Sequence, residues 1–245
     1  MNLSANTILI TGGATGIGFA LARQLSQHGN RVIICGRSEE ALLKAQAAVP
    51  ALITHVCDVT DTSSRQAMVN WLGAAHPELN VVINNAGIQL RRDFKDDDAL
   101  EKLEQEIAIN FTAPIRLISE LLPQLRRQPQ AVIVNVTSAL AFAPLAGVPV
   151  YCATKAAMHA YTLSLRHQLK ALGIRVVEMA PPLVDTDLGG ENRIANTRAQ
   201  PMISPEDFAA DALAQLENDQ DEVLVGQAAG ARKMGETLFA RMNGI

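Results

Sequence analysis

The sequence predicts an α/β protein with one doubly wound parallel sheet of about seven strands and helices on both faces. Short apolar runs rich in β-branched residues alternate along the chain with helix-like stretches of roughly 10–15 residues, as in repeated βαβ units. Several runs, most clearly residues 131–136, are apolar at nearly every position. That pattern is typical of parallel strands that are buried on both faces.

Each expected element follows from its residue pattern. The expected strands cover residues 7–10, 31–35, 52–56, 81–83, 131–136, 174–179 and 222–225. The expected helices cover residues 19–28, 39–49, 61–75, 100–125, 151–172 and 232–242, and a further helix begins at Ser204-Pro205. Asp61 or Thr60 is expected to cap the third helix, and the acidic run at 96–98 to be a solvated helix start. No linker or repeat interrupts the alternation, so a single domain over residues 1–245 is expected, with a substrate loop at about 182–204.

Composition excludes several classes of function. The chain has 245 residues, 48% of them hydrophobic, and a net charge of −4 without a basic patch, so nucleic acid is not expected as a partner. No apolar run reaches the roughly 18 residues of a membrane span, and the start of the chain shows no signal-peptide pattern. The three cysteines lack CxxC spacing and are expected to be free thiols in a reducing cytoplasm. No His/Cys cluster is present, so no metal site is expected.

A glycine-rich turn follows the first strand directly and leads into a helix. It runs Thr11-Gly-Gly-Ala-Thr-Gly-Ile-Gly18. Glycines let the backbone approach a pyrophosphate, and the helix N-terminus offers free N–H groups to it. A dinucleotide site is therefore predicted here, although the same turn also occurs as a packing turn without a ligand.

The end of the second strand bears on the choice of nucleotide. NAD(H) sites usually carry an acidic residue here, which binds the ribose hydroxyls. This chain has Gly36 followed by Arg37. Because a guanidinium binds phosphate with two charge-assisted hydrogen bonds, NADP(H) is predicted over NAD(H). The alternative is a solvated arginine in a loop.

Three side chains are predicted to meet at the carboxyl edge of the sheet. Ser138 lies at the end of the fifth strand, and Tyr151 and Lys155 lie one turn apart on the next helix. Asn110 interrupts an apolar helix face, where a buried amide needs partners. Taken singly, these residues also fit a strand-end cap, an amphipathic helix pair and a kink near Pro114.

With these motifs in order, the chain resembles the short-chain dehydrogenase/reductase (SDR) family over essentially its whole length, and within it the DltE-like oxidoreductases. The motifs are the glycine turn, Asp58, Asn84-Asn85-Ala86-Gly87, Asn110, Ser138 and Tyr151-x-x-x-Lys155. The resemblance implies a Rossmann-type fold and a catalytic tetrad of Asn110, Ser138, Tyr151 and Lys155. The cofactor-binding positions that it implies are Gly12, Thr15, Gly16, Ile17, Gly18, Asp58, Val59, Asn85, Ala86, Gly87, Tyr151, Lys155, Pro181, Leu183, Val184 and Thr186, to which Arg37 is added.

The expected reaction interconverts a carbonyl and a secondary alcohol by hydride transfer. Tyr151 is expected as general acid in reduction and general base in oxidation, with its pKa lowered by the Lys155 ammonium. The resemblance implies that Ser138 holds the substrate oxygen, that Lys155 also binds the nicotinamide ribose, and that Asn110 places a water for proton supply. The chain departs from the family at Pro182, where the usual residue is glycine.

The substrate is expected to be a small or medium, largely uncharged ketone or alcohol. The expected apolar lining is Leu140, Phe142, Leu145, Val148, Leu188, Ile194 and Met202, and the arginines that could reach in are Arg91, Arg92, Arg193 and Arg198. Apolar residues on more than one face of the helices around 110–125 and 151–172, together with the resemblance, indicate a homodimer or homotetramer. Two other functions stay open: an NADP(H)-binding redox sensor or scaffold without turnover, and a lyase or dehalogenase that binds no nucleotide.

Overall fold

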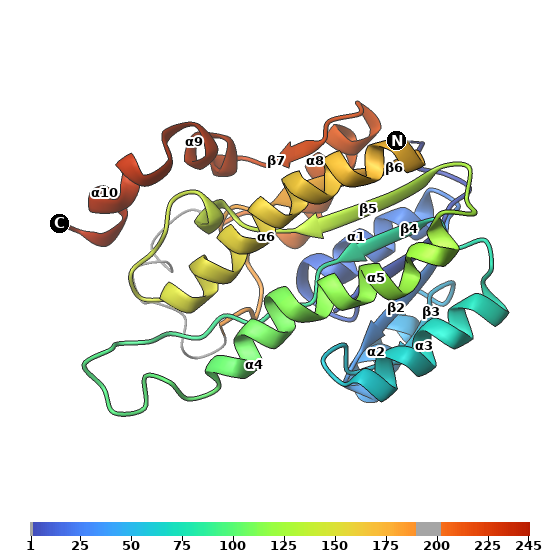
Figure 1. Cartoon of the computed structure of the whole chain (residues 1–245), viewed down its shortest axis with the longest axis horizontal. Helices are drawn as coiled ribbons and strands as arrows, with labels where there is room; N and C mark the ends of the chain where they lie inside the picture. The colour runs from blue at the N-terminus through green and yellow to red at the C-terminus, as the bar shows by residue number, and fades with distance from the viewer. Residues whose placement is uncertain (1, 190–201) are drawn as a thin grey trace.

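A seven-stranded parallel sheet forms the centre of the protein, in the order β3-β2-β1-β4-β5-β6-β7 (Figure 1). The structure is a computed structural model that describes residues 2–189 and 202–245. The strands are β1 (Thr7–Thr11), β2 (Arg31–Gly36), β3 (Ile53–Val56), β4 (Val81–Asn84), β5 (Ala131–Val136), β6 (Ile174–Ala180) and β7 (Glu222–Leu224). The predicted doubly wound sheet is thereby confirmed. Its strand order reverses between β1 and β4, where open sheets of this kind bind their ligands.

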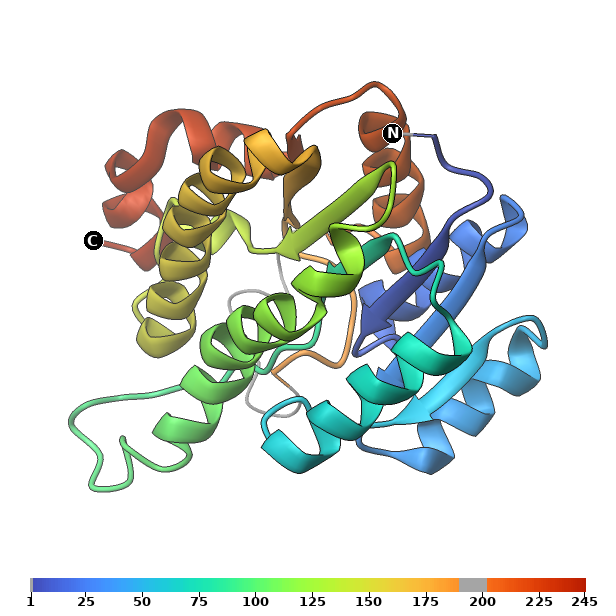
Figure 2. The ribbon, with the colours of Figure 1, turned by 45° about the vertical axis from the view of Figure 1, so that its right-hand side comes forward.

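Helices lie on both faces of the sheet (Figures 1 and 2), and a hydrophobic core lies between the sheet and the helices on each face. Helices α1 (Gly16–Gln27), α2 (Glu39–Ala48) and α8 (Pro205–Glu217) pack on one face, and α3 (Thr62–Ala75), α5 (Ala113–Leu125) and α6 (Pro149–Leu169) on the other. Successive residues of β1 serve opposite cores, because side chains alternate along a strand: Ile8 and Ile10 face the first core and Leu9 the second. This burial on both sides accounts for the continuous apolar runs.

The stretch expected as one helix over residues 100–125 is divided into three parts. It consists of α4 (Leu103–Ile107), a π-helical turn, η1 (Ala108–Thr112), and α5. The acidic run at 96–98 lies in turns before Leu103, so its assignment to a helix start is wrong. The π turn accommodates an extra residue in the middle of the helix, a feature that often occurs at functional sites.

Other boundaries differ by smaller amounts. The helix expected at 151–172 begins at Pro149 as α6 and ends in a short 3₁₀ turn, η3 (Lys170–Leu172). The expected closing helix at 232–242 consists of α9 (Gln227–Met234), a 3₁₀ turn, η5 (Gly235–Leu238), and α10 (Phe239–Asn243). Asp61 caps α3 as predicted, with its carboxylate accepting a hydrogen bond from the Ser64 N–H at 2.7 Å.

All three cysteines are buried and unpaired, as expected for free thiols. Among the described residues, no helix combines the length and apolar character that crossing a membrane requires.

Candidate active site

The glycine turn after β1 has a conformation and packing that require glycine. Gly12 and Gly16 have φ angles of +63° and +53°, which side chains rarely tolerate. A Cβ on Gly18 would lie 2.2 Å from the carbonyl oxygen of Gly12, so this glycine lets α1 pack against the turn. The Thr15 side chain does not cap α1, which leaves the N–H groups of the first turn available to an anion. The turn therefore fits a pyrophosphate.

Residues after β4 hold this turn in place. The Thr11 hydroxyl accepts hydrogen bonds from the N–H groups of Asn85 and Ala86, each at 3.0 Å. The Asn85 amide donates to the carbonyl oxygens of Thr11 and Gly12 at 3.0 and 3.1 Å. The Asn85 side chain thus fixes the backbone of the turn. Asn85 also lines the cavity described next.

One large cavity of about 1080 Å³ opens at the carboxyl edge of the sheet. Most of the predicted site residues line it: Gly12, Thr15, Gly16, Ile17, Asn85, Ala86, Gly87, Ser138, Tyr151, Lys155, Pro181, Leu183, Val184 and Thr186. Five predicted residues do not: Gly18, Arg37, Asp58, Val59 and Asn110. The structure therefore brings the glycine turn and the Ser-Tyr-Lys group to one space.

Ser138, Tyr151 and Lys155 converge as their elements predict. Ser138 follows the end of β5 and makes a hydrogen bond with the Tyr151 side chain. The Lys155 ammonium lies 5.6 Å from the centre of the Tyr151 ring and donates to the carbonyl oxygen of Val136 at 2.8 Å. Tyr151 and Lys155 are 5% and 4% exposed, so burial dominates their ionisation.

This burial corrects one expectation. It raises the pKa of Tyr151 above its ordinary value, and the hydrogen bond from Ser138 offsets only part of the rise. The expectation that the Lys155 ammonium lowers the pKa of Tyr151 is therefore wrong for this structure. Burial also lowers the pKa of Lys155, from 10.5 to about 8. Both groups thus favour their neutral forms more than they would in water.

Asn110 lies in the π turn beside this group. Its Oδ1 accepts from the Ile88 N–H at 2.9 Å, and its amide nitrogen donates to the Ile88 carbonyl at 2.8 Å and to the Thr154 hydroxyl at 3.3 Å. A Cβ built on Gly87 would lie 3.3 Å from Asn110 Oδ1 and 3.7 Å from Lys155 Nζ. Asn110 and Lys155 are therefore neighbours across Gly87, and the buried amide has the partners that it needs.

Arg37 and Asp58 lie together beyond the cavity wall, at the ends of β2 and β3. Burial raises the pKa of Asp58, but hydrogen bonds from Thr60 and the charge of Arg37 outweigh it, so the pKa is lowered overall. The Asp58 carboxylate accepts from the Thr60 hydroxyl and N–H at 2.7 and 2.9 Å. Arg37 itself is exposed. A Cβ built on Gly36, the residue before Arg37, meets no atom within 4 Å, so the space at this position is open.

The loop that carries Pro182 is anchored at its far end. Val184 and Ile203 form an isolated parallel bridge, in which the Asp185 N–H donates to the Ile203 carbonyl at 2.9 Å. At its near end the Pro181 carbonyl accepts from the Ala139 N–H at 2.9 Å, and Pro182 lines the cavity. This part of the loop is therefore tied to α8 on one side and to the residues after Ser138 on the other.

The substrate end of the cavity differs in part from the expected lining. Leu140, Leu145, Val148, Leu188 and Arg91 line it as expected. Phe142 and Met202 do not, because Phe142 packs on His159 instead. Arg92 is buried in an ion pair with Glu106 at 3.0 Å. Arg92 belongs to the segment between β4 and α4, part of which extends outward from the rest of the chain (Figure 1). Arg193, Ile194 and Arg198 lie outside the described residues.

The C-terminal helices supply a wall that sequence reasoning missed. It is formed by Gln227, Gly230, Ala231, Met234, Leu238, Arg241 and Met242. The amphipathic pattern of the closing segment indicated an apolar face without indicating what that face covers. The cavity thus has one end at the glycine turn and the residues after β4, and a largely apolar end that the last helices complete.

Comparison with known proteins agrees with this architecture. The family described as short chain dehydrogenase matches residues 6–197. The oxidoreductase DltE of Bacillus subtilis is 45% identical over 99% of this chain and 98% of its own length. The 3-oxoacyl-(acyl-carrier-protein) reductase FabG of Rickettsia bellii is 34% identical over 93% of this chain and 95% of its own.

The solved structures agree with the sequence relatives. A short-chain dehydrogenase from Sphingobium yanoikuyae in complex with NADPH superposes with a TM-score of 0.81 at 25% identity, covering 94% of each chain. The chain therefore belongs to the short-chain dehydrogenase/reductase family, in its DltE-like branch.

Proposed function

We propose that this oxidoreductase uses NADP(H) to interconvert a carbonyl and a secondary alcohol, with Tyr151 as the general acid and base. The observation that carries the proposal is the meeting of Ser138, Tyr151 and Lys155 in one cavity with the glycine turn. A bound nicotinamide supplies the hydride in such a site, and the protein supplies binding, orientation and the proton.

Tyr151 donates its proton to the carbonyl oxygen during reduction. Its raised pKa keeps the phenol protonated near neutral pH, which suits a general acid. Ser138 holds the same oxygen against Tyr151. Lys155 binds the ribose of the nicotinamide half, and Asn110, its neighbour across Gly87, holds a water that delivers protons to Lys155. Together these residues form the proposed tetrad.

The glycine turn holds the pyrophosphate of the nucleotide. Gly12, Gly16 and Ile17 bring their backbone to the cavity at the start of α1, where the helix dipole favours negative charge. Gly18 contributes by letting α1 pack against the turn, and not by touching the nucleotide. The adenine is flanked by Asp58 and Val59. The nicotinamide side is lined by Pro181, Leu183, Val184 and Thr186.

Arg37 binds the 2′-phosphate and so selects NADP(H). The exposure of Arg37 supports this choice, together with the glycine at position 36, where an NAD(H) site usually carries an acidic residue. The Sphingobium relative in complex with NADPH is consistent with it.

The proposed substrate is a small or medium ketone or alcohol that is largely uncharged. The apolar residues at the far end of the cavity support this class, with Leu140, Leu145, Met234 and Leu238 among them. The FabG relative, named as a 3-oxoacyl reductase, also supports reduction of a carbonyl.

The test compares two substitutions on one helix. Tyr151→Phe should abolish NADPH-dependent turnover across a panel of ketones and leave NADPH binding, measured by calorimetry, nearly unchanged. Tyr161→Phe, ten positions further along α6, serves as the matched control and should keep wild-type turnover. Wild-type turnover in Tyr151→Phe contradicts the proposal. Nucleotide binding without turnover in the wild type, over the whole panel, supports a redox sensor or scaffold instead.

We further propose a cytoplasmic homodimer or homotetramer. Three free cysteines suit a reducing compartment, and apolar side chains such as Ile107 and Leu163 are exposed on the helices of one face. Light scattering over a range of concentrations tests the assembly, and a constant monomer mass contradicts it.

A further inference from the structure

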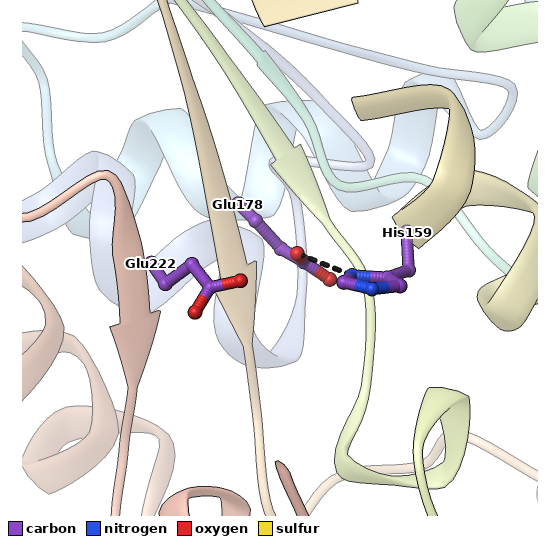
Figure 3. A group of neighbouring side chains, drawn as sticks. All are labelled: His159, Glu178 and Glu222. Atoms are coloured by element: carbon purple, nitrogen blue, oxygen red, sulfur yellow. Dashed lines mark hydrogen bonds and ion pairs between the residues drawn. The ribbon is translucent and has the colours of Figure 1, made fainter. Parts of the chain in front are cut away.

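A fully buried carboxylate, Glu178, lies in the middle of β6 outside the cavity. Its exposed fraction is 0%, and both of its oxygens have short hydrogen-bond partners. Oε1 accepts from the Thr137 hydroxyl at 2.7 Å, and Oε2 lies 2.7 Å from Nδ1 of His159. Figure 3 shows the His159 ring reaching from α6 toward this carboxylate.

The two partners of Glu178 belong to the two elements that carry the proposed catalytic group. Thr137 comes immediately before Ser138, and His159 lies one helical turn beyond Lys155 on α6. His159 also contacts the chain after Ser138, because its ring packs edge-on against Phe142 with ring centres 4.9 Å apart. Thr137, just before Ser138, is bonded to Glu178, and Phe142, shortly after it, packs on His159. The Glu178–His159 pair therefore holds the chain on both sides of Ser138.

We infer that Glu178 and His159 are positioning residues, which fix Ser138 on β5 relative to Tyr151 and Lys155 on α6. Neither touches the cavity, so they act only through Thr137 and Phe142. The inference rests on the proposed roles of Ser138 and Tyr151. It adds to them the reason why the chain places a carboxylate in a strand that is otherwise apolar apart from Arg175 near its start.

Energetics favour a role in position over a role in stability. Burying a carboxylate is costly unless it is fully hydrogen-bonded, and apolar residues often stabilise a core better than a buried ionic pair does. Charge-assisted hydrogen bonds at 2.7 Å are strong and directional. Glu178 therefore fixes the relative placement of two elements more tightly than apolar contacts could.

A third carboxylate, Glu222 on β7, faces the pair, and together with His159 and Glu178 it has the composition of a metal site (Figure 3). Its charge is already matched, however, by Arg232, whose guanidinium lies 3.2 Å away. Arg232 also lies over the Phe142 ring, 5.2 Å from its centre. With each oxygen of Glu178 bonded and Glu222 paired with an arginine, the group is organised as a hydrogen-bond network.

The experiment separates position from stability with four variants. His159→Leu removes the hydrogen bond to Glu178, and His159→Asn replaces the Nδ1 donor with an amide. Thr137→Val removes the other hydrogen bond. His167→Leu, two turns further along α6 and exposed, is the matched control. Each variant is assayed for kcat, for KM of NADPH and for melting temperature.

His159→Leu and Thr137→Val should each lower kcat about tenfold and leave KM for NADPH within about twofold, as expected for the loss of one hydrogen bond to a charged group. His159→Asn should restore most of the lost kcat. Wild-type kcat in His159→Leu overturns the inference. Equal losses in the Leu and Asn variants, in step with their melting temperatures, overturn it as well.

A measurement without turnover keeps the inference separate from the proposed function. The chain has two tyrosines, so protein labelled with ¹³Cζ-tyrosine gives two resonances, which Tyr161→Phe assigns. The Tyr151 resonance should shift in His159→Leu and return in His159→Asn, while that of Tyr161 stays in place. An unmoved Tyr151 resonance refutes the inference even where turnover is measured. A shift in a protein that reduces no ketone refutes the proposed function alone.

Discussion

Replacing Arg37 with alanine tests how the protein chooses its nucleotide. The side chain is exposed in the turn after β2, and among the described residues it makes no hydrogen bond or ion pair within contact distance. The positive charge of Arg37 helps to lower the pKa of Asp58. The guanidinium is therefore available to a phosphate group, and its removal should leave the fold unchanged.

The size of the effect follows from the exposure of the arginine. A hydrogen bond to a charged group contributes about 1.5–3 kcal/mol, and solvent screening reduces the value at an exposed site. We expect a loss near the lower limit, which corresponds to an increase of about tenfold in the Kd for NADPH. The Kd for NADH should stay within about twofold, because NADH has no 2′-phosphate.

Calorimetric titration of both nucleotides measures the two constants directly. Arg31→Ala is the matched control, since Arg31 begins the same strand, is exposed and pairs with Glu78. It makes the same change in net charge at the far end of β2, roughly 20 Å from Arg37 along an extended chain. Equal weakening of NADPH and NADH, or the same loss in Arg31→Ala, refutes the reasoning. Raising the salt concentration should reduce the difference between wild type and Arg37→Ala.

Other substitutions test the remaining parts of the site. Gly36→Asp should favour NADH, because its side chain enters open space beside the ribose position; an unchanged ratio of the two Kd values contradicts this. Burial lowers the pKa of Lys155 from 10.5 to about 8, so between these values the unfolded chain binds more protons than the folded one. The free energy of unfolding should therefore rise with pH, by about 2 kcal/mol from pH 7 to 9.5, and lose this rise in Lys155→Met. If urea titrations show the same dependence of unfolding free energy on pH for the wild type and Lys155→Met, this prediction is wrong. Gly18→Ala should severely destabilise the protein, because the new Cβ meets the Gly12 carbonyl at 2.2 Å, whereas Gly73→Ala, with its nearest contact at 4.0 Å, should not. Similar melting temperatures for the two variants would be the contrary result.

Much of the site could be predicted from the sequence because its signals are local. The glycine turn, and the pair Tyr151 and Lys155, depend on spacing within one turn or one helix. Ser138 could be placed because a strand end fixes which edge of the sheet it reaches. In each case the neighbouring residues in the chain contain the information.

Other features depend on contacts that spacing does not encode. The raised pKa of Tyr151 comes from burial, which is a property of the packed structure. The C-terminal wall with Met234 and Leu238 comes from helices whose apolar face could have covered any surface. The bond between Glu178 and His159 joins residues on a strand and a helix. One signal was visible, since a glutamate inside the run Ile174–Ala180 is unusual for a buried strand.

The π turn at Ala108–Thr112 has a consequence for how this part of the chain can vary. A π turn contains one residue more than the α-helical path between the same ends. Deleting a single residue there would let α4 and α5 join as one regular helix and would rotate Asn110 by about 100° relative to one of them. Substitutions that preserve the chain length leave the Asn110 amide bonded to Ile88 and beside Lys155. Deleting one residue moves the amide away from both. The position of Asn110 is thus set by residue count as much as by residue identity.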